Sequence, residues 1–278
     1  MSVSVHTNSS AMIALQNLNA TNNKMEDVQK KISTGLAVSS AKDNSAVYSI
    51  AQNQRADLSG LNAVRDSLNR ANSIADVSMA AGESVSDLLN QLREKVVGAM
   101  DTSIDTVSRK ALNGDFTSIM GQIKHIVENA TFNGSNILNG SVTSDIQFIA
   151  NADANSNITL AVRDLSFGAS ILVMSSQTTL LTSTQASAAA VLTALDASIE
   201  NLNSNLGALG SQAKQIEGHI SFIAKLDDAI TGGIGHLVDA DMAKESSRLQ
   251  ALQVQQQLGT QSLSIANQAP QQILSLFK

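Results

Sequence analysis

Residues 181–223 of the chain read LTSTQASAAAVLTALDASIENLNSNLGALGSQAKQIEGHISFI. Aliphatic residues recur in this stretch at strict intervals of seven: Leu181, Ala188, Leu195, Leu202, Leu209, Ile216 and Ile223. A second row lies three residues before members of the first: Leu192, Ile199, Leu206, Ala213 and Ile220. Side chains that alternate at spacings of three and four share one face of an α-helix. The stretch therefore predicts one long helix with a continuous apolar seam.

The same spacing recurs in three other parts of the chain. It runs near the N-terminus through Ala11, Ala14, Leu18, Thr21, Met25, Val28 and Ile32. A longer seam comprises Leu61, Val64, Leu68, Ala71, Ala75, Ser78, Gly82, Val85, Leu89, Leu92, Val96 and Ala99. After a break expected near Asn113-Gly114, a third seam comprises Phe116, Ile119, Ile123, Ile126 and Ala130.

The expected helices are too long for a compact globule. At 1.5 Å per residue, helices over 61–99 and 181–223 would measure roughly 58 Å and roughly 63 Å. A globular chain of this length would be about 48 Å across. We therefore expect a mostly α fold, an elongated antiparallel helical bundle or coiled coil.

Two regions interrupt the helical pattern. The turn signals Asn133-Gly134 and Asn139-Gly140 precede two branched apolar runs, at 146–149 and 158–162. They predict a small β-hairpin region at about 133–170. The second interruption is Thr231-Gly232-Gly233-Ile234-Gly235, which we interpret as a joint, after which Asp239 or Asp241 can cap a new helix.

The composition excludes several classes of function. The chain has 278 residues, no Cys and no Trp, and a net charge of −6. Disulfide scaffolds, thiol catalysis and Cys-ligated metals are therefore excluded. A negative net charge with 3% aromatic residues argues against nucleic-acid binding. The charged fraction, 15%, is low for a soluble protein and favours self-association.

Both ends of the chain lack charged residues. No Asp, Glu, Lys or Arg occurs from Met1 to Asn23 or from Leu249 to Phe277. Asn, Ser and Gln interrupt both stretches, so we expect neither a cleaved secretory signal nor a membrane span. The C-terminal stretch is interpreted as a helix that packs on protein.

No arrangement of polar residues predicts catalysis. The four histidines are scattered, and no pair has metal-binding helical spacing: His6, His125, His219 and His236. The G-G-x-G at 232–235 lacks the strand and lysine of a phosphate site, and the pairs Asp227-Asp228 and Asp239/Asp241 are best explained as caps and solvated faces. We expect no enzyme, no cofactor and no metal.

Several strings resemble those of bacterial flagellins, in order along almost the whole chain. They are Val5-His6-Thr7-Asn8, Ile32-Ser33-Thr34-Gly35-Leu36, Ser40-Ala41-Lys42-Asp43-Asn44-Ser45-Ala46, Phe132-Asn133-Gly134 with Ile137-Leu138-Asn139-Gly140, the run from Leu237 to Leu249, and Ser264-Ile265-Ala266-Asn267-Gln268-Ala269-Pro270 with Leu274-Ser275-Leu276-Phe277. The chain looks like a short flagellin that lacks large outer domains.

The resemblance implies a structural subunit of the flagellar filament, exported unfolded and polymerised head-to-tail into a hollow helical propeller. Residues 1–43 with 240–278 would form a terminal coaxial-helix layer, disordered in the monomer. Residues 44–239 would form the inner bundle with the β-hairpin. Implied partners are other flagellin copies, the flagellar type III export apparatus, a secretion chaperone, and the hook-associated junction and cap proteins. The implied location is extracellular, in the bacterial flagellum.

Eight apolar residues are expected to pack the terminal layer on polymerisation. They are Leu18, Met25, Ile32, Leu249, Leu252, Leu263, Ile273 and Phe277. Packing within one subunit is the alternative explanation for the same residues.

The stretch from Leu89 to Lys95 resembles an inner-helix block of flagellins that serves in subunit contacts and is bound by a vertebrate innate receptor. Arg93 and Glu94 match this block, whereas Gln91 stands where arginine is usual. We therefore expect weak or absent recognition by the receptor.

Three other functions were weighed. A hook–filament junction protein would share the terminal helices, but the complete C-terminal motif favours flagellin. An enzyme on a helical bundle would need a polar cluster within the seams. A coiled-coil needle or adhesin subunit would explain the periodicity but not the ordered motifs.

Overall fold

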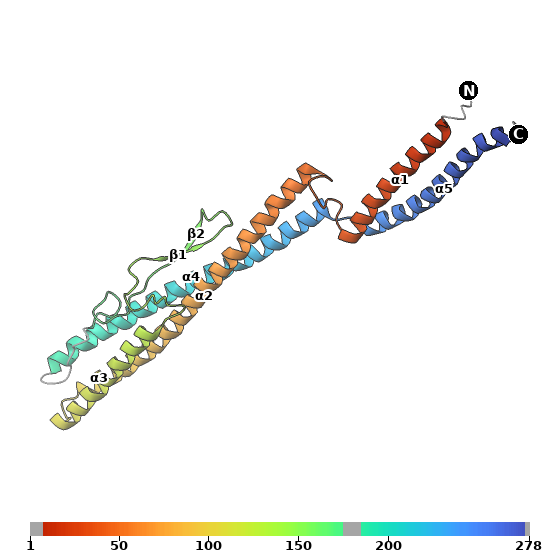
Figure 1. The fold of residues 1–278 in the computed structure, drawn as a ribbon. Coiled ribbons are helices and arrows are strands. Elements are labelled where there is room, and N and C mark those ends of the chain that lie inside the picture. Colours follow the sequence, from red (N-terminus) through yellow and green to blue (C-terminus); the bar gives the residue numbers. More distant parts are fainter. Residues whose placement is uncertain (1–7, 175–184, 276–278) are drawn as a thin grey trace. The chain divides into compact units, whose positions relative to one another are not determined.

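A computed structural model describes residues 8–174 and 185–275 of the chain, with side chains in the C-terminal part described for 188–268. Figure 1 shows its helices and strands in chain order. They are α1 (Ser9–Thr34), α2 (Ser45–Ala99), α3 (Thr106–Asn129), β1 (Ile146–Ile149), β2 (Asn157–Leu160), α4 (Gln185–Val238) and α5 (Met242–Ser275). The mostly helical fold with a small hairpin is confirmed.

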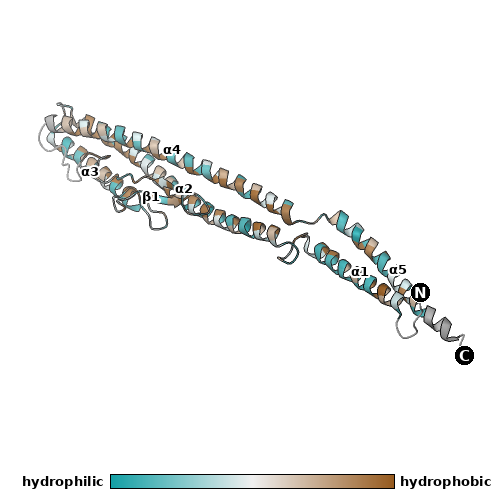
Figure 2. Cartoon of the chain, turned by 90° about the horizontal axis from the view of Figure 1, so that it is seen from above, coloured by the Kyte–Doolittle hydropathy of each residue, from teal (hydrophilic) through white to brown (hydrophobic). Residues whose placement is uncertain are grey.

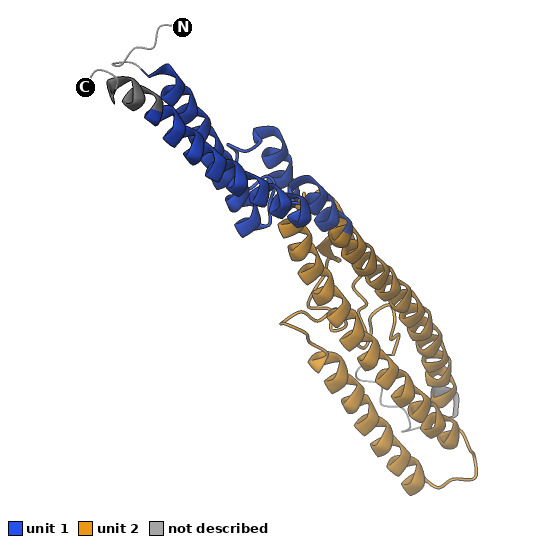
Figure 3. Ribbon diagram, turned by 90° about the vertical axis from the view of Figure 1, so that its right-hand side faces the viewer, with its two compact units in different colours: residues 1–56, 229–278 blue, residues 57–228 orange. Residues whose placement is uncertain are grey.

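The chain divides into two compact units, coloured in Figure 3. Unit 1 comprises residues 1–56 and 229–278, and unit 2 comprises residues 57–228. Both α2 and α4 contribute residues to each unit. The sequence placed the corresponding boundaries at 43/44 and 239/240, where the long helices end.

The core of unit 2 follows the seam predicted for α2. All twelve seam positions from Leu61 to Ala99 are buried. On α4 the six described members of the strict seven-residue row, from Ala188 to Ile223, are buried as well. Leu181, the first member of that row, lies outside the described residues. Figure 2 shows apolar residues recurring along α4. Burial of these aliphatic rows supplies the main stabilisation of the unit.

Helices α2 and α4 are antiparallel in unit 2. Arg93 on α2 pairs with Asp196 on α4, and Arg65 pairs with Asp227 further along. Between these ion pairs the helices approach closely at Gly82, where an added Cβ would lie 2.5 Å from Cδ2 of Leu206. A glycine at this seam position therefore leaves space for the facing leucine.

The break expected near Asn113-Gly114 is wrong. Helix α3 continues through both residues, and the chain turns earlier, between the end of α2 and Thr106. Asp105 caps α3 by accepting a hydrogen bond from the Ser108 amide at 2.8 Å. Buried Phe116 anchors α3 beyond the glycine. Packing on this face outweighs the cost of about 1 kcal/mol for a glycine within a helix.

The β-hairpin forms where the sequence predicts it. Strands β1 and β2 pair in antiparallel register, with Ile146 opposite Leu160. The turn between β1 and β2 lies against both long helices of unit 2. The carbonyl of Ala150 lies 2.7 Å from Nε2 of His219 on α4. An added Cβ at Gly60 on α2 would lie 2.9 Å from Cβ of Ala152 and 3.2 Å from its backbone.

Unit 1 is built on the antiparallel pair of α1 and α5, which lie side by side in Figure 1. Helix α1 ends at Gly35, whose φ of +73° is the left-handed conformation that glycine adopts readily. Residues 35–44 and 239–241 form two connecting segments, joined by the antiparallel bridge between Leu36 and Asp239.

The joint expected at Thr231–Gly235 is wrong. Helix α4 runs through these residues to Val238, and the break falls at 239–241. Ile234 and Val238 are buried, so an apolar row continues past the three glycines. The cap expected after the break is present, because Oδ1 of Asp241 accepts hydrogen bonds from the amides of Ala243 and Lys244.

Gly60→Ala is expected to loosen the hairpin turn. The added methyl group meets the backbone of Ala152, which cannot rotate away as a side chain can. Hydrogen exchange of residues 150–156 should accelerate although alanine favours the helix. Gly218→Ala on α4, where an added Cβ has nothing within 4 Å, is the control and should stabilise the protein by about 0.5–1 kcal/mol. Unchanged exchange in Gly60→Ala would contradict the close approach.

Candidate functional site

The facing sides of α1 and α5 carry a seam of small and polar residues among aliphatic ones. On α1, every predicted seam position from Ala11 to Ile32 is half-buried or buried. On α5 the matching positions are Glu245, Leu249, Leu252, Gln256, Gly259, Leu263 and Ala266. Among them only Glu245 and Leu252 are fully buried. The pair therefore covers its seam only in part.

Six of the eight residues predicted for terminal-layer packing lie on this seam. Leu18, Met25 and Ile32 belong to α1, and Leu249, Leu252 and Leu263 belong to α5. Within one chain these six residues are half-buried or buried. Ile273 lies in α5 beyond the described side chains, and Phe277 lies outside the described residues.

Sequence reasoning missed a second apolar set on the outer sides of the same helices. Met12 on α1 is 65% exposed, and Leu258 and Ile265 on α5 are 59% and 62% exposed. The set comprises Met12, Ile13 and Leu15 on α1 with Val254, Leu258 and Ile265 on α5, and leaves out Met242, the exposed first residue of α5. We call it the outer apolar set. Its signal was present in the sequence, since 254, 258 and 265 share one helical face on the side of α5 opposite the seam.

Contacts centred on Asp43, which we call the clip, hold the first connecting segment, residues 35–44. Oδ2 of Asp43 accepts hydrogen bonds from the amide and hydroxyl of Ser39, each at 2.9 Å, and from the amide of Ser40 at 2.9 Å. Nζ of Lys30 on α1 lies 3.4 Å from Oδ1 of Asp43. The Ser39 donors, with Ser40 and Lys30, hold the pKa of Asp43 well below its usual value.

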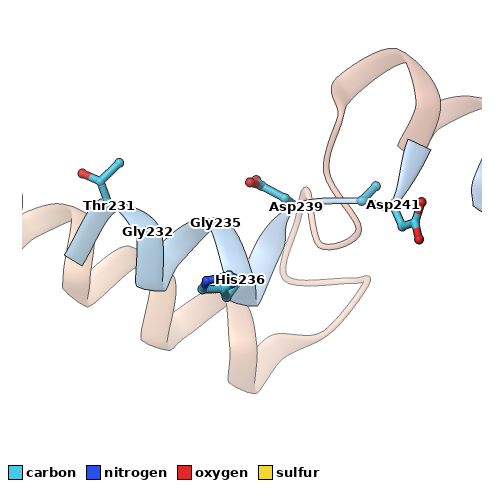
Figure 4. A pocket seen from close by; sticks show the side chains of 7 residues that line it. Thr231, Gly232, Gly235, His236, Asp239 and Asp241 are labelled. Carbon is cyan, nitrogen blue, oxygen red and sulfur yellow. The ribbon is translucent and has the colours of Figure 1, made fainter. Parts of the chain in front are cut away.

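A shallow hollow lies at the end of α4. Thr231, Gly232, Gly235, His236, Asp239, Ala240 and Asp241 line it. Figure 4 shows the carboxylates of Asp239 and Asp241 pointing away from each other. Asp241 is engaged in capping α5. Across residues 8–174 and 185–275, no group of three His, Cys, Asp or Glu side chains is arranged to hold a metal.

The histidines are dispersed, as the sequence suggested. His125 lies on α3 and His236 on α4, while His219 contacts the hairpin turn and the ring of Phe222, at 5.7 Å between centroids. His6 lies outside the described residues. In the described part of the chain, no helix is long and apolar enough to cross a membrane.

Two regions of the chain match known protein families. Residues 5–143 match the bacterial flagellin N-terminal helical region, and residues 192–277 match the bacterial flagellin C-terminal helical region. The chain belongs to the bacterial flagellin family. Flagellins are structural proteins, and this flagellin is a structural subunit of the flagellar filament.

The relatives match over their full length. Flagellin FljJ of Caulobacter vibrioides is 51% identical over 100% of this chain and 99% of its own. A flagellin of Brucella melitensis is 37% identical over 99% of each chain. A solved structure described as a flagellar hook-associated protein from Vibrio parahaemolyticus has a TM-score of 0.57. It is 14% identical and covers 71% of this chain and 100% of that one, so it supports the fold alone.

The inner-helix residues of this flagellin lie on α2. Nε of Arg93 donates to Oδ1 of Asp196 on α4 at 2.7 Å, so Arg93 links two helices of its own subunit. Glu94 is exposed. The side chain of Arg93 is also exposed, at 54%, so both side chains remain accessible to solvent on α2.

Asp43→Asn is expected to release the first connecting segment. An amide still accepts hydrogen bonds but loses the charge that pairs with Lys30 and strengthens the bonds from Ser39 and Ser40. Hydrogen exchange of residues 37–43 should accelerate at neutral pH. Asp27→Asn, a nearby exposed residue on α1, is the control and should leave this exchange unchanged.

The clip should also weaken in acid. Because the pKa of Asp43 is lower in the folded state, its contribution is complete above the unfolded value of about 3.9 and declines as pH falls below it. The protection of residues 37–43, measured against the intrinsic exchange rate at each pH, should therefore fall below about pH 4 in the natural chain, and less in Asp43→Asn. Identical pH profiles would contradict this role.

Proposed function

We propose that copies of this flagellin assemble head-to-tail through the outer apolar set into a hollow helical filament. The observation that supports the proposal is the exposure of six large apolar side chains on α1 and α5. Each large apolar side chain gains about 1.5–3 kcal/mol when it is fully removed from water. Neighbouring copies would supply that burial. Residues 1–23 and 249–277, which carry the outer apolar set, contain no charged side chain that would have to be removed from water.

The two outer faces favour an open assembly. The exposed residues of α1 differ from those of α5, so contact between an α1 face and an α5 face joins unlike surfaces. Such heterologous contacts propagate in one direction and give rings or helical filaments. The terminal layer, residues 1–43 with 240–278, would form the inside of the filament, with residues 44–239 around it.

The seam residues support assembly in a different way. Leu18, Met25, Ile32, Leu249, Leu252 and Leu263 hold α1 against α5, and we propose that Ile273 and Phe277 extend this packing. Because small and polar residues share the seam, an isolated pair gains little against the entropy of ordering the two helices. We propose that the terminal helices form stably only when neighbours cover the outer apolar set.

Unfolded ends suit export through a narrow channel. We propose that the chain passes through the flagellar type III export apparatus with a secretion chaperone, and that it functions outside the cell. The filament would meet hook-associated junction and cap proteins at its two ends. Glu94, exposed on α2, would contribute to subunit contacts of the inner bundle. With Gln91 in place of arginine, we expect weak stimulation of the vertebrate innate receptor.

Leu258→Glu and Ile265→Glu are each expected to abolish polymerisation. Either change places a carboxylate where a neighbouring copy would bury a leucine or isoleucine, at a cost of several kcal/mol. Pelleting and electron microscopy of seeded reactions measure the polymer. Thermal unfolding of unit 2 should be unchanged, because both residues lie in unit 1.

Gln257→Glu is the matched control, since it adds the same charge at an exposed polar position beside Leu258. It should polymerise within about threefold of the natural rate. Filaments of normal length from Leu258→Glu and Ile265→Glu would refute the proposed surface. Equal loss in the control would show that charge alone prevents assembly.

Hydrogen exchange of dilute monomer is expected to show weak protection at both ends. Residues 9–34 and 249–275 should exchange rapidly in monomer and slowly in filaments, while the buried seam of α2 from Leu61 to Ala99 stays protected in both. Strong protection of the ends in monomer would contradict folding on assembly.

A further inference from the structure

The seam between α1 and α5 contains a polar pair at one level. Nε2 of Gln256 donates a hydrogen bond to Oδ1 of Asn22 at 2.8 Å. Both side chains are half-buried. A polar pair at a coiled-coil seam costs stability but favours the alignment that satisfies it. Asn8 also reaches across, to the backbone carbonyl of Ala266, but a backbone carbonyl is present at every alignment and selects less strongly.

About one turn along α1 from Asn22, a large side chain faces a glycine. An added Cβ at Gly259 would lie 3.2 Å from Cδ1 of Leu18 and 3.9 Å from its Cβ. Gly259 is the single glycine of α5. Leu18 therefore has one position along α5 where no side chain opposes it.

A shift of one heptad would lose both features. It would move the helices by about 10.5 Å relative to each other. Asn22 would then face Leu249 or Leu263, which offer no hydrogen bond, and the amide of Gln256 would lose its partner. Leu18 would face Leu252 or Ala266 in place of Gly259. Apart from Thr21 and Glu245, the other seam positions carry small and aliphatic residues every three or four positions and would accept the shift.

We infer that the Asn22–Gln256 hydrogen bond, supported by the fit of Leu18 against Gly259, fixes the register of α1 on α5. Asn22 and Gln256 are therefore positioning residues for assembly, and this role rests on the proposed function. The contact of Asn8 with Ala266 places Met12 within about one helical turn of Ile265 as measured along the helix axes, with each residue on the outer face of its own helix. A heptad shift would move these two members of the outer apolar set apart and remove the surface that a neighbouring copy covers.

The chain offers a clean way to measure register because it contains no cysteine. The Leu18→Cys/Gly259→Cys variant reports the native register, since the Cβ separation of 3.9 Å suits a disulfide. Leu18→Cys/Leu252→Cys and Leu18→Cys/Ala266→Cys report a shift of one heptad in either direction. Each reporter is mixed with excess natural subunits and seeds, oxidised mildly, and scored for the intramolecular cross-link in filaments and in soluble subunits.

In the natural seam, only the native reporter should cross-link efficiently. Adding Asn22→Leu/Gln256→Leu to each reporter should raise the shifted cross-links about tenfold relative to the native one, the order expected for losing one buried hydrogen bond. Asn23→Leu/Gln257→Leu is the matched control, because it makes the same changes at the adjacent exposed positions. It should leave the distribution unchanged.

Two further measurements separate register from stability. The Asn22→Leu/Gln256→Leu chain should retain or increase its helix content, measured by circular dichroism, since leucine adds apolar contacts. Its polymerisation should nevertheless fall. The swapped pair Asn22→Gln/Gln256→Asn should restore the native register in part. A single native register in the double-leucine chain, or no cross-link from any reporter in either fraction, would overturn the inference. The first of these results would leave the proposed function intact, whereas polymerisation by Leu258→Glu and Ile265→Glu would contradict that function.

Discussion

A narrow apolar seam must be covered along its whole length, and this constraint governs the structure. Each long helix carries a stripe of aliphatic residues at spacings of three and four, which stabilises a helix only when a second helix lies on it. In unit 2 the chain supplies the cover itself, and every seam position of α2 from Leu61 to Ala99 is buried. In unit 1 the cover is partial, because most seam positions of α1 and α5 are only half-buried. On the outer faces of the same helices, Met12, Leu258 and Ile265 are exposed. One constraint thus yields a self-sufficient bundle and a unit that needs neighbours.

The distribution of charge follows the same division. Ion pairs such as Arg93–Asp196 link helices of unit 2 at positions that stay in water. The terminal helices instead use amides, and Gln256 and Asn22 satisfy each other within the seam. Amides can be buried at lower cost than ionised groups, so they fit surfaces that polymerisation would remove from water. The charged clip at Asp43 lies at the boundary of this charge-poor region, in the connecting segment.

The sequence predicted the seams well because apolar spacing is a local property that packing then uses. Helix ends were harder to predict. Glycine predicts a break at Asn113-Gly114 and at 231–235, but buried Phe116, Ile234 and Val238 keep both segments helical. The actual turn at 100–105 contains neither glycine nor proline, and its signal is the capping carboxylate of Asp105. For the candidate site, spacing located the seam residues such as Leu18 and Leu252. It could not show that Leu258 and Ile265 remain exposed, because exposure depends on which face the partner helix covers.

We propose that neighbouring copies bury the outer apolar set of α1 and α5. Cryo-electron microscopy of filaments grown from the purified protein, at a resolution that shows side chains, tests it most directly. We expect Met12, Leu258 and Ile265 to pack against terminal helices of neighbouring subunits, with Asn22 opposite Gln256 in every copy. Density that places these three side chains in solvent, with the subunits joined elsewhere, would contradict it.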